Sequence, residues 1–193
     1  MIHPDTCVKP THKGMGLFAN RDFRRGEILW IIDDHDIKIP LEEYRAMDAL
    51  RRHKFNTYSY MDVQRRVIVP WDEGKYVNHS CEPNSTALVQ FDNISVALRD
   101  IRAGEEIVED YSCYYGHFES FTCQCGSARC RGLVSGDEAY EADLRLDLDD
   151  MATVINALEQ ALLQEETGEN GRLLKLLAEY ACEAMPARQA SGG

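Results

Sequence analysis

Three cysteines fall close together near residue 125, at a spacing that suits a metal site. They follow the pattern Cys123-x-Cys125-x4-Cys130. Thiolates this close can converge on one tetrahedral Zn2+, which takes four ligands, so a fourth must come from elsewhere in the chain. The alternative is three unrelated cysteines in a loop. By residue type, the candidates for the fourth ligand are Cys81, His117, Cys113 and His79.

A second polar cluster, Tyr76-Val-Asn-His-Ser-Cys-Glu-Pro-Asn84, lies between two apparent strands. Taken alone, it has a modest explanation, because asparagine and the Pro-Asn dipeptide commonly form turns. It also brings an imidazole and a thiol, which can bind ligands or metals. A turn and a binding segment are therefore both kept as interpretations.

Two weaker signals come from a glycine loop and a tyrosine. Lys13-Gly-Met-Gly-Leu-Phe18 places two glycines ahead of a strand, where the backbone can approach a ligand closely, although an ordinary tight turn also explains it. The dinucleotide-binding fingerprint fails, because no third glycine and helix follow. Gly104-Glu-Glu-Ile-Val-Glu-Asp-Tyr111 is a turn and a strand that ends in a tyrosine, and a tyrosine at this position most often serves packing.

Taken in order, these four segments form one pattern, and the chain resembles the SET domain family of protein lysine methyltransferases. They are similar to the family's glycine motif, its Asn-His-Ser-Cys-x-Pro-Asn motif, its Gly-Glu-Glu…Asp-Tyr motif and its post-SET zinc segment. The resemblance covers roughly residues 9 to 133 and is especially close to the histone-lysine branch at Phe121-Thr-Cys-Gln-Cys-Gly-Ser127. It implies an α+β, mainly β fold of small curved sheets with a pseudoknot, a post-SET zinc loop and an appended C-terminal helical hairpin.

The resemblance also implies which residues bind S-adenosylmethionine and zinc. The glycine loop should present its backbone to the cofactor, and Phe121 should cover the adenine. Lys75 stands where relatives often have arginine. Cys81 matches the family's fourth zinc ligand. The implied cofactor residues are Lys13, Gly14, Met15, Gly16, Lys75, Asn78, His79 and Phe121, and the implied Zn2+ ligands are Cys81, Cys123, Cys125 and Cys130.

The implied reaction moves a methyl group from a sulfonium to a lysine amine. The methyl is already activated, so the protein must align the amine and exclude water. The amine must also be neutral, and with a reference pKa of about 10.4 only ~0.1% of it is uncharged near neutral pH. Tyr111 matches the catalytic tyrosine beside the transferring methyl. Tyr58 resembles a second catalytic tyrosine, which lines the lysine channel, with strand packing as the alternative.

One residue of the implied channel departs from the family pattern. Two positions before the catalytic tyrosine, histone-modifying relatives usually carry Phe or Tyr, which influences how many methyl groups fit. This chain has Glu109 instead. Three alternatives are open for its carboxylate: it holds the ammonium, it accepts the ammonium proton, or it points away altogether. The number of methyl groups transferred is therefore open.

The elements that must position these residues are mostly short strands. Apolar runs between glycines and turn residues predict strands at 26–32, 66–69, 86–91 and 94–98. Apolar residues at helical spacing over 41–54 predict one short helix after Pro40. We expect a SET domain over 9–116 and a post-SET zinc segment over 117–134.

After Gly132 the pattern becomes helical. Leu144, Leu148, Met151 and Ile155 begin the apolar stripe of an amphipathic helix, and a second such stripe precedes Pro186. The pattern predicts a helical hairpin over 137–186. An isolated hairpin buries too little to be stable, so we expect it to pack on the SET domain or on a second copy, which would form a homodimer.

The charge balance limits the partners. The 193 residues include 33 acidic and 21 basic ones, for a net charge of −12 at pH 7. This charge repels a phosphate backbone, so we expect no direct nucleic-acid contact and a basic protein substrate, histone or histone-like. No apolar run is long enough for a membrane span, and the start does not resemble a secretory signal. We therefore expect an intracellular protein, cytoplasmic if bacterial and nuclear if eukaryotic, with delivery to a host left open.

Two other functions stay open at this point. One is a catalytically inactive SET module that binds a basic protein segment. The other is methylation of a small molecule or a non-lysine side chain. Tyr111, Asn78 and His79 favour the lysine methyltransferase over the binding module, because binding alone does not need a hydroxyl at the point of methyl transfer.

Overall fold

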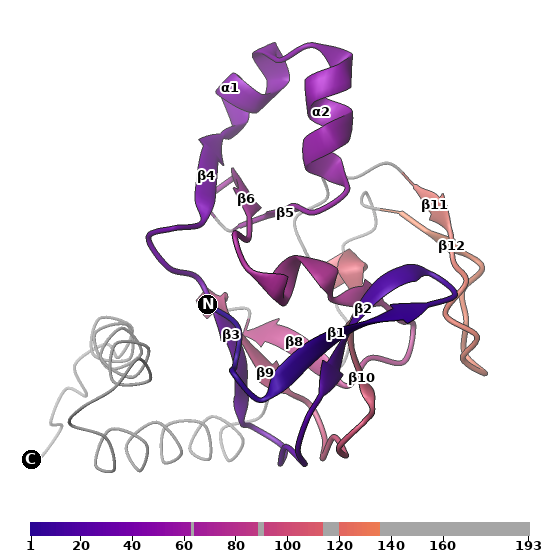
Figure 1. Ribbon diagram of the computed structural model, residues 1–193. Coiled ribbons are helices and arrows are strands. Elements are labelled where there is room, and N and C mark those ends of the chain that lie inside the picture. The colour runs from indigo at the N-terminus through magenta and orange to yellow at the C-terminus, as the bar shows by residue number, and fades with distance from the viewer. Residues whose placement is uncertain (63, 89–90, 114–119, 136–193) are drawn as a thin grey trace, which may run out of the picture. The chain divides into compact units, whose positions relative to one another are not determined.

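The computed structural model describes residues 1–62, 64–88, 91–113 and 120–135, and over these ranges the fold is mainly β (Figure 1). The chain divides into two units, residues 1–146 and 147–193, and every described residue belongs to the first. The prediction of a mainly β fold with few helices is confirmed. The hairpin predicted over 137–186 lies outside the described residues.

One four-stranded sheet carries most of the polar motifs. Its strands, in spatial order, are β1 (Thr6–Thr11), β2 (Gly14–Ala19), β10 (Glu106–Glu109) and β7 (Asn78–His79). β10 pairs antiparallel with β2 and parallel with β7, so that Glu109 lies opposite His79. The pairing sets the Asn-His segment beside the segment that leads into Tyr111. The pseudoknot threading itself stays a prediction.

Smaller sheets complete the described part of the fold. The strands predicted at 86–91 and 94–98 are shifted, because the second observed strand begins at Phe91, which was predicted to end the first, and includes residues 92–93, predicted in neither. The strands at 26–32 and 66–69 correspond to single observed strands. One three-stranded sheet has the strand order β3 (Ile28–Ile31), β9 (Phe91–Ala97) and β8 (Ser85–Leu88). A second has the order β4 (Ile37–Pro40), β6 (Arg66–Val69) and β5 (Tyr60–Met61). A two-stranded sheet pairs β11 (Phe121–Thr122) with β12 (Leu133–Val134).

The single helix predicted over 41–54 is wrong, because the structure has two: α1 (Leu41–Ala46) and α2 (Ala49–Asn56). The backbone is extended at Met47, and the Asp48 carboxylate accepts a hydrogen bond from the Arg51 N–H at 2.9 Å, which caps α2. A short 3-10 helix, η1 (Glu73–Tyr76), precedes β7, and a second, η2 (Tyr111–Cys113), follows β10. Within the described ranges, no helix is long and apolar enough to cross a membrane.

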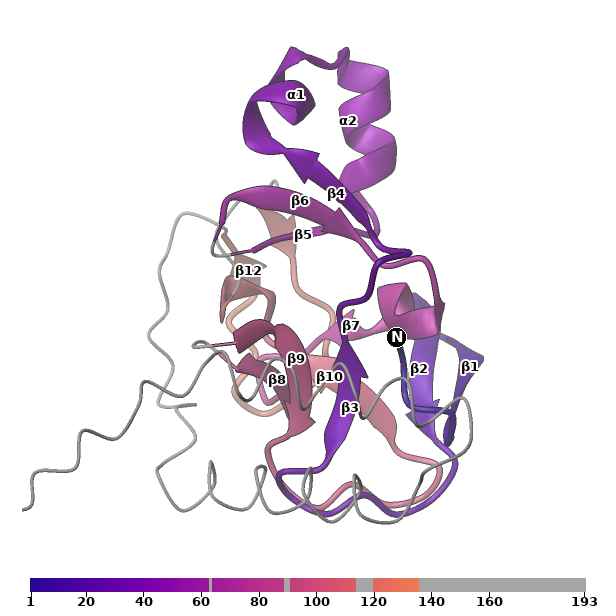
Figure 2. The ribbon, with the colours of Figure 1, turned by 90° about the vertical axis from the view of Figure 1, so that its left-hand side faces the viewer.

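Among the described residues, two apolar clusters show how these elements pack. Below the four-stranded sheet, the buried side chains are Leu17, Ala19, Phe23, Leu29, Ala97, Ile101 and Ile107. A smaller cluster, Ile39, Tyr44 and Val67, fixes α1 against β4 and β6. Figure 2 shows the two helices beside β4 and β6, away from the sheet of β3, β8 and β9. The helical segment therefore has its own small core.

Candidate functional site

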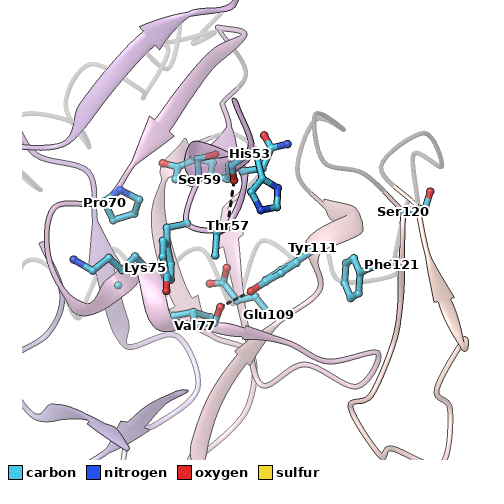
Figure 3. A pocket seen from close by; sticks show the side chains of 14 residues that line it. His53, Thr57, Ser59, Pro70, Lys75, Val77, Glu109, Tyr111, Ser120 and Phe121 are labelled. Atoms are coloured by element: carbon cyan, nitrogen blue, oxygen red, sulfur yellow. Dashed lines mark hydrogen bonds between the residues drawn. The ribbon is translucent and has the colours of Figure 1, made fainter. Parts of the chain in front are cut away.

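A cavity of about 410 Å3 opens beside the end of β10 (Figure 3). Its wall includes five of the residues predicted from sequence: Tyr58, Lys75, Glu109, Tyr111 and Phe121. It also includes residues that the sequence analysis did not single out, among them His53, Asn56, Thr57, Tyr60 and Val77. Most of these come from α2 and the turn after it, where no sequence motif marks them.

Tyr111 is held at the cavity wall by its hydroxyl, which donates a hydrogen bond to the Val77 carbonyl oxygen at 2.7 Å. Burial raises the pKa of Tyr111 above its ordinary value, and the charges of Glu109 and Glu106 raise it further. The phenol therefore stays protonated. Phe121 meets its ring edge-on, with 6.1 Å between centroids, and Figure 3 shows both rings on the same side of the cavity.

Glu109 lies in the wall of the same cavity and is only 5% exposed. Its carboxylate accepts a hydrogen bond from the hydroxyl of Ser95, on β9. Figure 3 shows the Glu109 carboxylate beside the Tyr111 hydroxyl. The cavity wall at this point is therefore acidic and polar.

Tyr58 is 44% exposed and precedes β5. Its ring meets Tyr76 edge-on at 5.8 Å between centroids. Tyr58 lies outside β5 and lines the cavity. Its position therefore fits the channel interpretation rather than strand packing.

The glycine loop lies against Asn78, and β2, which carries its glycines, contacts η1, from which Gly74 and Lys75 line the cavity. The Asn78 amide nitrogen donates to the Met15 carbonyl oxygen at 2.9 Å and to Glu106 Oε1 at 2.8 Å, and Lys13 Nζ lies 3.2 Å from that same oxygen. A Cβ at Gly16 would stand 2.6 Å from Glu106 Oε1 and 2.8 Å from Thr11 Cγ2, so a larger residue would force these side chains to move. Gly14 has a φ of 110°, which requires glycine. The loop can thus offer bare backbone to a ligand.

His79 links the tyrosine segment to the cysteines. Its Nδ1 accepts the Tyr111 N–H at 3.3 Å, and its Nε2 lies 3.3 Å from Cys81 Sγ. Burial, helped by the charges of Arg131 and Lys13, lowers the pKa of His79 to about 4 against the opposing effect of Asp110. Although Asp110 lies 3.7 Å away, the ring is neutral, because Nδ1 serves as an acceptor. We assign the proton to Nε2, facing the thiol.

The four predicted metal ligands come together. The sulfur atoms of Cys81, Cys123, Cys125 and Cys130 all lie within 4.8 Å of one another. Those of Cys81 and Cys123 are 3.7 Å apart, close to the ~3.8 Å edge of a tetrahedron with zinc–sulfur bonds of ~2.3 Å. The thiol set and its spacing fit a soft divalent metal. Of the other candidates for the fourth ligand, His117 and the side chain of Cys113 lie outside the described structure.

Arg131 ties the cysteine segment to the site, and the sequence analysis did not identify it. Its guanidinium lies 2.6 Å from Asp110 Oδ1 and 3.1 Å from Ser112 Oγ, and its backbone N–H lies 3.4 Å from Cys81 Sγ. Asp110 is 3% exposed. In the sequence, these two residues are marked only by their neighbours: Asp110 precedes the predicted catalytic Tyr111, and Arg131 follows the predicted zinc ligand Cys130.

Similar proteins include several with names that state a function. The chain is 34% identical over 143 residues to the variant-silencing SET domain-containing protein of Plasmodium falciparum, covering 65% of this chain and 5% of that protein. It is 31% identical over 142 residues to the histone-lysine N-methyltransferase ATX2 of Arabidopsis thaliana (66% and 13%). It is 27% identical over 189 residues to ASHH2 of the same plant, also named a histone-lysine N-methyltransferase (90% and 10%). The chain thus spans a small fraction of these relatives' lengths.

The model of the SET domain family matches residues 14–112, about half of the chain. This range includes the glycine loop, the Asn-His segment and Tyr111. SET methyltransferases in general use S-adenosylmethionine. The chain belongs to the SET domain family.

Proposed function

We propose that this protein transfers methyl groups from S-adenosylmethionine to the side-chain amine of lysine in a basic protein, a histone or histone-like tail. The observation that carries the proposal is the parallel pairing of β7 with β10. It sets Asn78 and His79 beside Glu109 and Tyr111 at the edge of the cavity. The names of the relatives and the net charge of −12 support a basic substrate.

In this proposal the glycine loop, Asn78 and Lys75 hold S-adenosylmethionine, which supplies a methyl group activated on sulfur. Asn78 Oδ1 accepts no hydrogen bond from any described residue and is open to a ligand donor. Tyr111, fixed by Val77, turns its oxygen lone pairs toward the incoming amine. The aromatic rings exclude water, which favours the neutral amine. Tyr58, at the exposed side of the cavity, would guide the lysine chain.

We further propose that the four clustered thiols bind one Zn2+. The ion would join Cys81, next to His79, to the post-SET segment that carries Phe121, and so order the cofactor site. Metal analysis of protein prepared without chelators should find about one zinc per chain. Less than about half an equivalent would contradict it. Removing the metal should weaken S-adenosylmethionine binding, measured by calorimetry, because ordering of the segment is coupled to the metal.

The direct test incubates the protein with labelled methyl donor and a panel of basic proteins, histones included. Label on lysine, located by mass spectrometry, supports the proposal. Binding of a basic peptide with no transfer under any condition would replace it with the inactive binding module. Label on a small molecule or another side chain would replace the substrate class.

The proposed organisation is a SET domain over 9–116, a post-SET segment over 117–134 and a helical hairpin over 137–186. A chain that ends at Leu133 should be less soluble and less thermally stable than the whole chain, because the hairpin buries its apolar stripe. Equal stability would contradict this packing. Light scattering on the whole chain would distinguish a monomer from a dimer.

A further inference from the structure

A second cavity, of about 60 Å3, lies behind the wall of the larger one. Tyr60, Pro70, Gly74, Val77 and Glu109 line both cavities and so form the partition between them. Much of the remaining lining is aliphatic. The partition therefore places one carboxylate between the proposed substrate channel and an inner chamber.

The polar groups of the inner chamber suit bound water. Trp30 is 8% exposed, and its indole N–H donates to no residue that the structure describes. Ser95 also lines the chamber and donates its hydroxyl to Glu109. A site for one water needs roughly 10–15 Å3 and at least about two polar partners. A water there would accept from the Trp30 N–H and donate to the Glu109 carboxylate.

Of the groups in the wall of the larger cavity, Glu109 is best suited to take a proton. Tyr111 stays a phenol, because burial and the charge of Glu109 both raise its pKa. Lys75 Nζ donates to the Trp71 carbonyl oxygen at 3.2 Å. His53 sits on the exposed side of α2. Glu109 alone combines burial with a carboxylate that faces the Tyr111 hydroxyl (Figure 3).

We propose that Glu109 is the general base that takes the proton from the substrate ammonium before methyl transfer. This inference rests on the proposed function. The ammonium N–H bond breaks and the proton moves to the carboxylate. The freed lone pair then forms the N–C bond to the methyl carbon while the C–S bond breaks and its electron pair stays on sulfur. Glu109 gives its proton to water once the channel empties, so each methyl transferred releases one proton.

Several other titratable groups lie on the elements around Glu109, and a variant changed at Glu109 alone retains all of them. β9 contributes the neutral Ser95. The titratable groups are His53 from α2, Tyr58 and Tyr60 around β5, Lys75 from η1, His79 opposite on β7, Glu106 and Asp110 along its own segment, and Tyr111 from η2.

The test compares the wild type with Glu109→Gln, which keeps the shape and removes the proton acceptor. Single-turnover methylation of a lysine peptide is measured below saturation from about pH 7 to about pH 9. The wild-type rate should be nearly level, whereas the variant should gain about tenfold per pH unit, because it can use only the neutral amine of pKa ~10.4. Near pH 7 the variant should be slower by roughly 10²-fold or more.

Controls separate this outcome from a structural defect. The exposed Glu43→Gln on α1 should keep the wild-type profile. If Glu109→Gln does not fold or does not bind S-adenosylmethionine, Glu109→Asp is measured in its place. This variant retains a carboxylate, so its methylation rate should stay nearly constant with pH. A rate that rises steeply with pH in Glu109→Asp overturns the proposal. The proposal is also overturned if the methylation rate of Glu109→Gln changes as little with pH as that of the wild type. It is overturned as well if the wild-type rate itself rises tenfold per pH unit. A wild type that methylates no basic protein refutes the proposed function as well.

Discussion

Replacing Arg131 by methionine removes the cation that faces a buried carboxylate. Asp110 is 3% exposed, and its Oδ1 lies 2.6 Å from the guanidinium. Asp110 also accepts from the N–H and hydroxyl of Ser112, at 3.0 and 2.7 Å, and lies 3.7 Å from His79 Nδ1. Removing one partner of a buried ion pair costs ~3–5 kcal/mol. We expect the lower end, about 3 kcal/mol of unfolding free energy, because the Ser112 bonds remain and Arg131 is 24% exposed.

Urea unfolding with zinc in excess, followed by tryptophan fluorescence, measures this cost. Arg129→Met is the matched control in the same loop: its guanidinium lies 2.9 Å from Glu82, but Arg129 is 81% exposed, so the unfolding free energy should change little. Adding Asp110→Asn to Arg131→Met should recover part of the loss, because no buried charge is then left unpaired. If Arg131→Met costs no more than Arg129→Met, the inferred coupling of the cysteine segment to the site is refuted.

Three further changes test the site. Tyr111→Phe should keep the fold and the cofactor affinity and lower single-turnover methyl transfer by roughly 10²-fold or more; unchanged turnover would remove Tyr111 from the chemistry. Gly16→Ala places a methyl group 2.6 Å from Glu106 Oε1, and calorimetry should show S-adenosylmethionine binding weaker by about tenfold or more. An NMR titration should show His79 neutral down to about pH 5.5, since its folded pKa is about 4 against a reference of about 6.5. Because the unfolded chain binds this proton first, stability should fall as pH drops from about 6.5 towards 4, and less so in His79→Asn.

Sequence patterns identified residues whose type is itself the signal. Glycines that must lack a side chain, thiols at ligand spacing and an Asn-His pair are visible without a structure. The pairing of β7 with β10 could not be predicted from periodicity, because strands of two and four residues are too short to show any. The family resemblance alone brought those segments together.

Other features depended on competition between local and distant interactions. The apolar spacing over 41–54 favoured one helix, yet Asp48 is a strong N-cap residue and starts a second one. Arg131 and Asp110 each look like surface residues in sequence, since buried charges are rare unless paired. Only the folded chain shows that they pair. The inner chamber behind Glu109 likewise exists through the packing of several strands.

The separate core beneath α1 has a consequence for how substrate preference can change. α2 has no buried residue, and α1 is held by Ile39, Tyr44 and Val67 rather than by the cluster under the four-stranded sheet. The cavity wall that α2 and the following turn supply can therefore be exchanged in evolution, or grafted by an engineer, with little strain on β7, which carries Asn78, or on β10, which leads into Tyr111. Under the proposed function, the residues that would transfer the methyl group and those that would contact the substrate can therefore change at different rates.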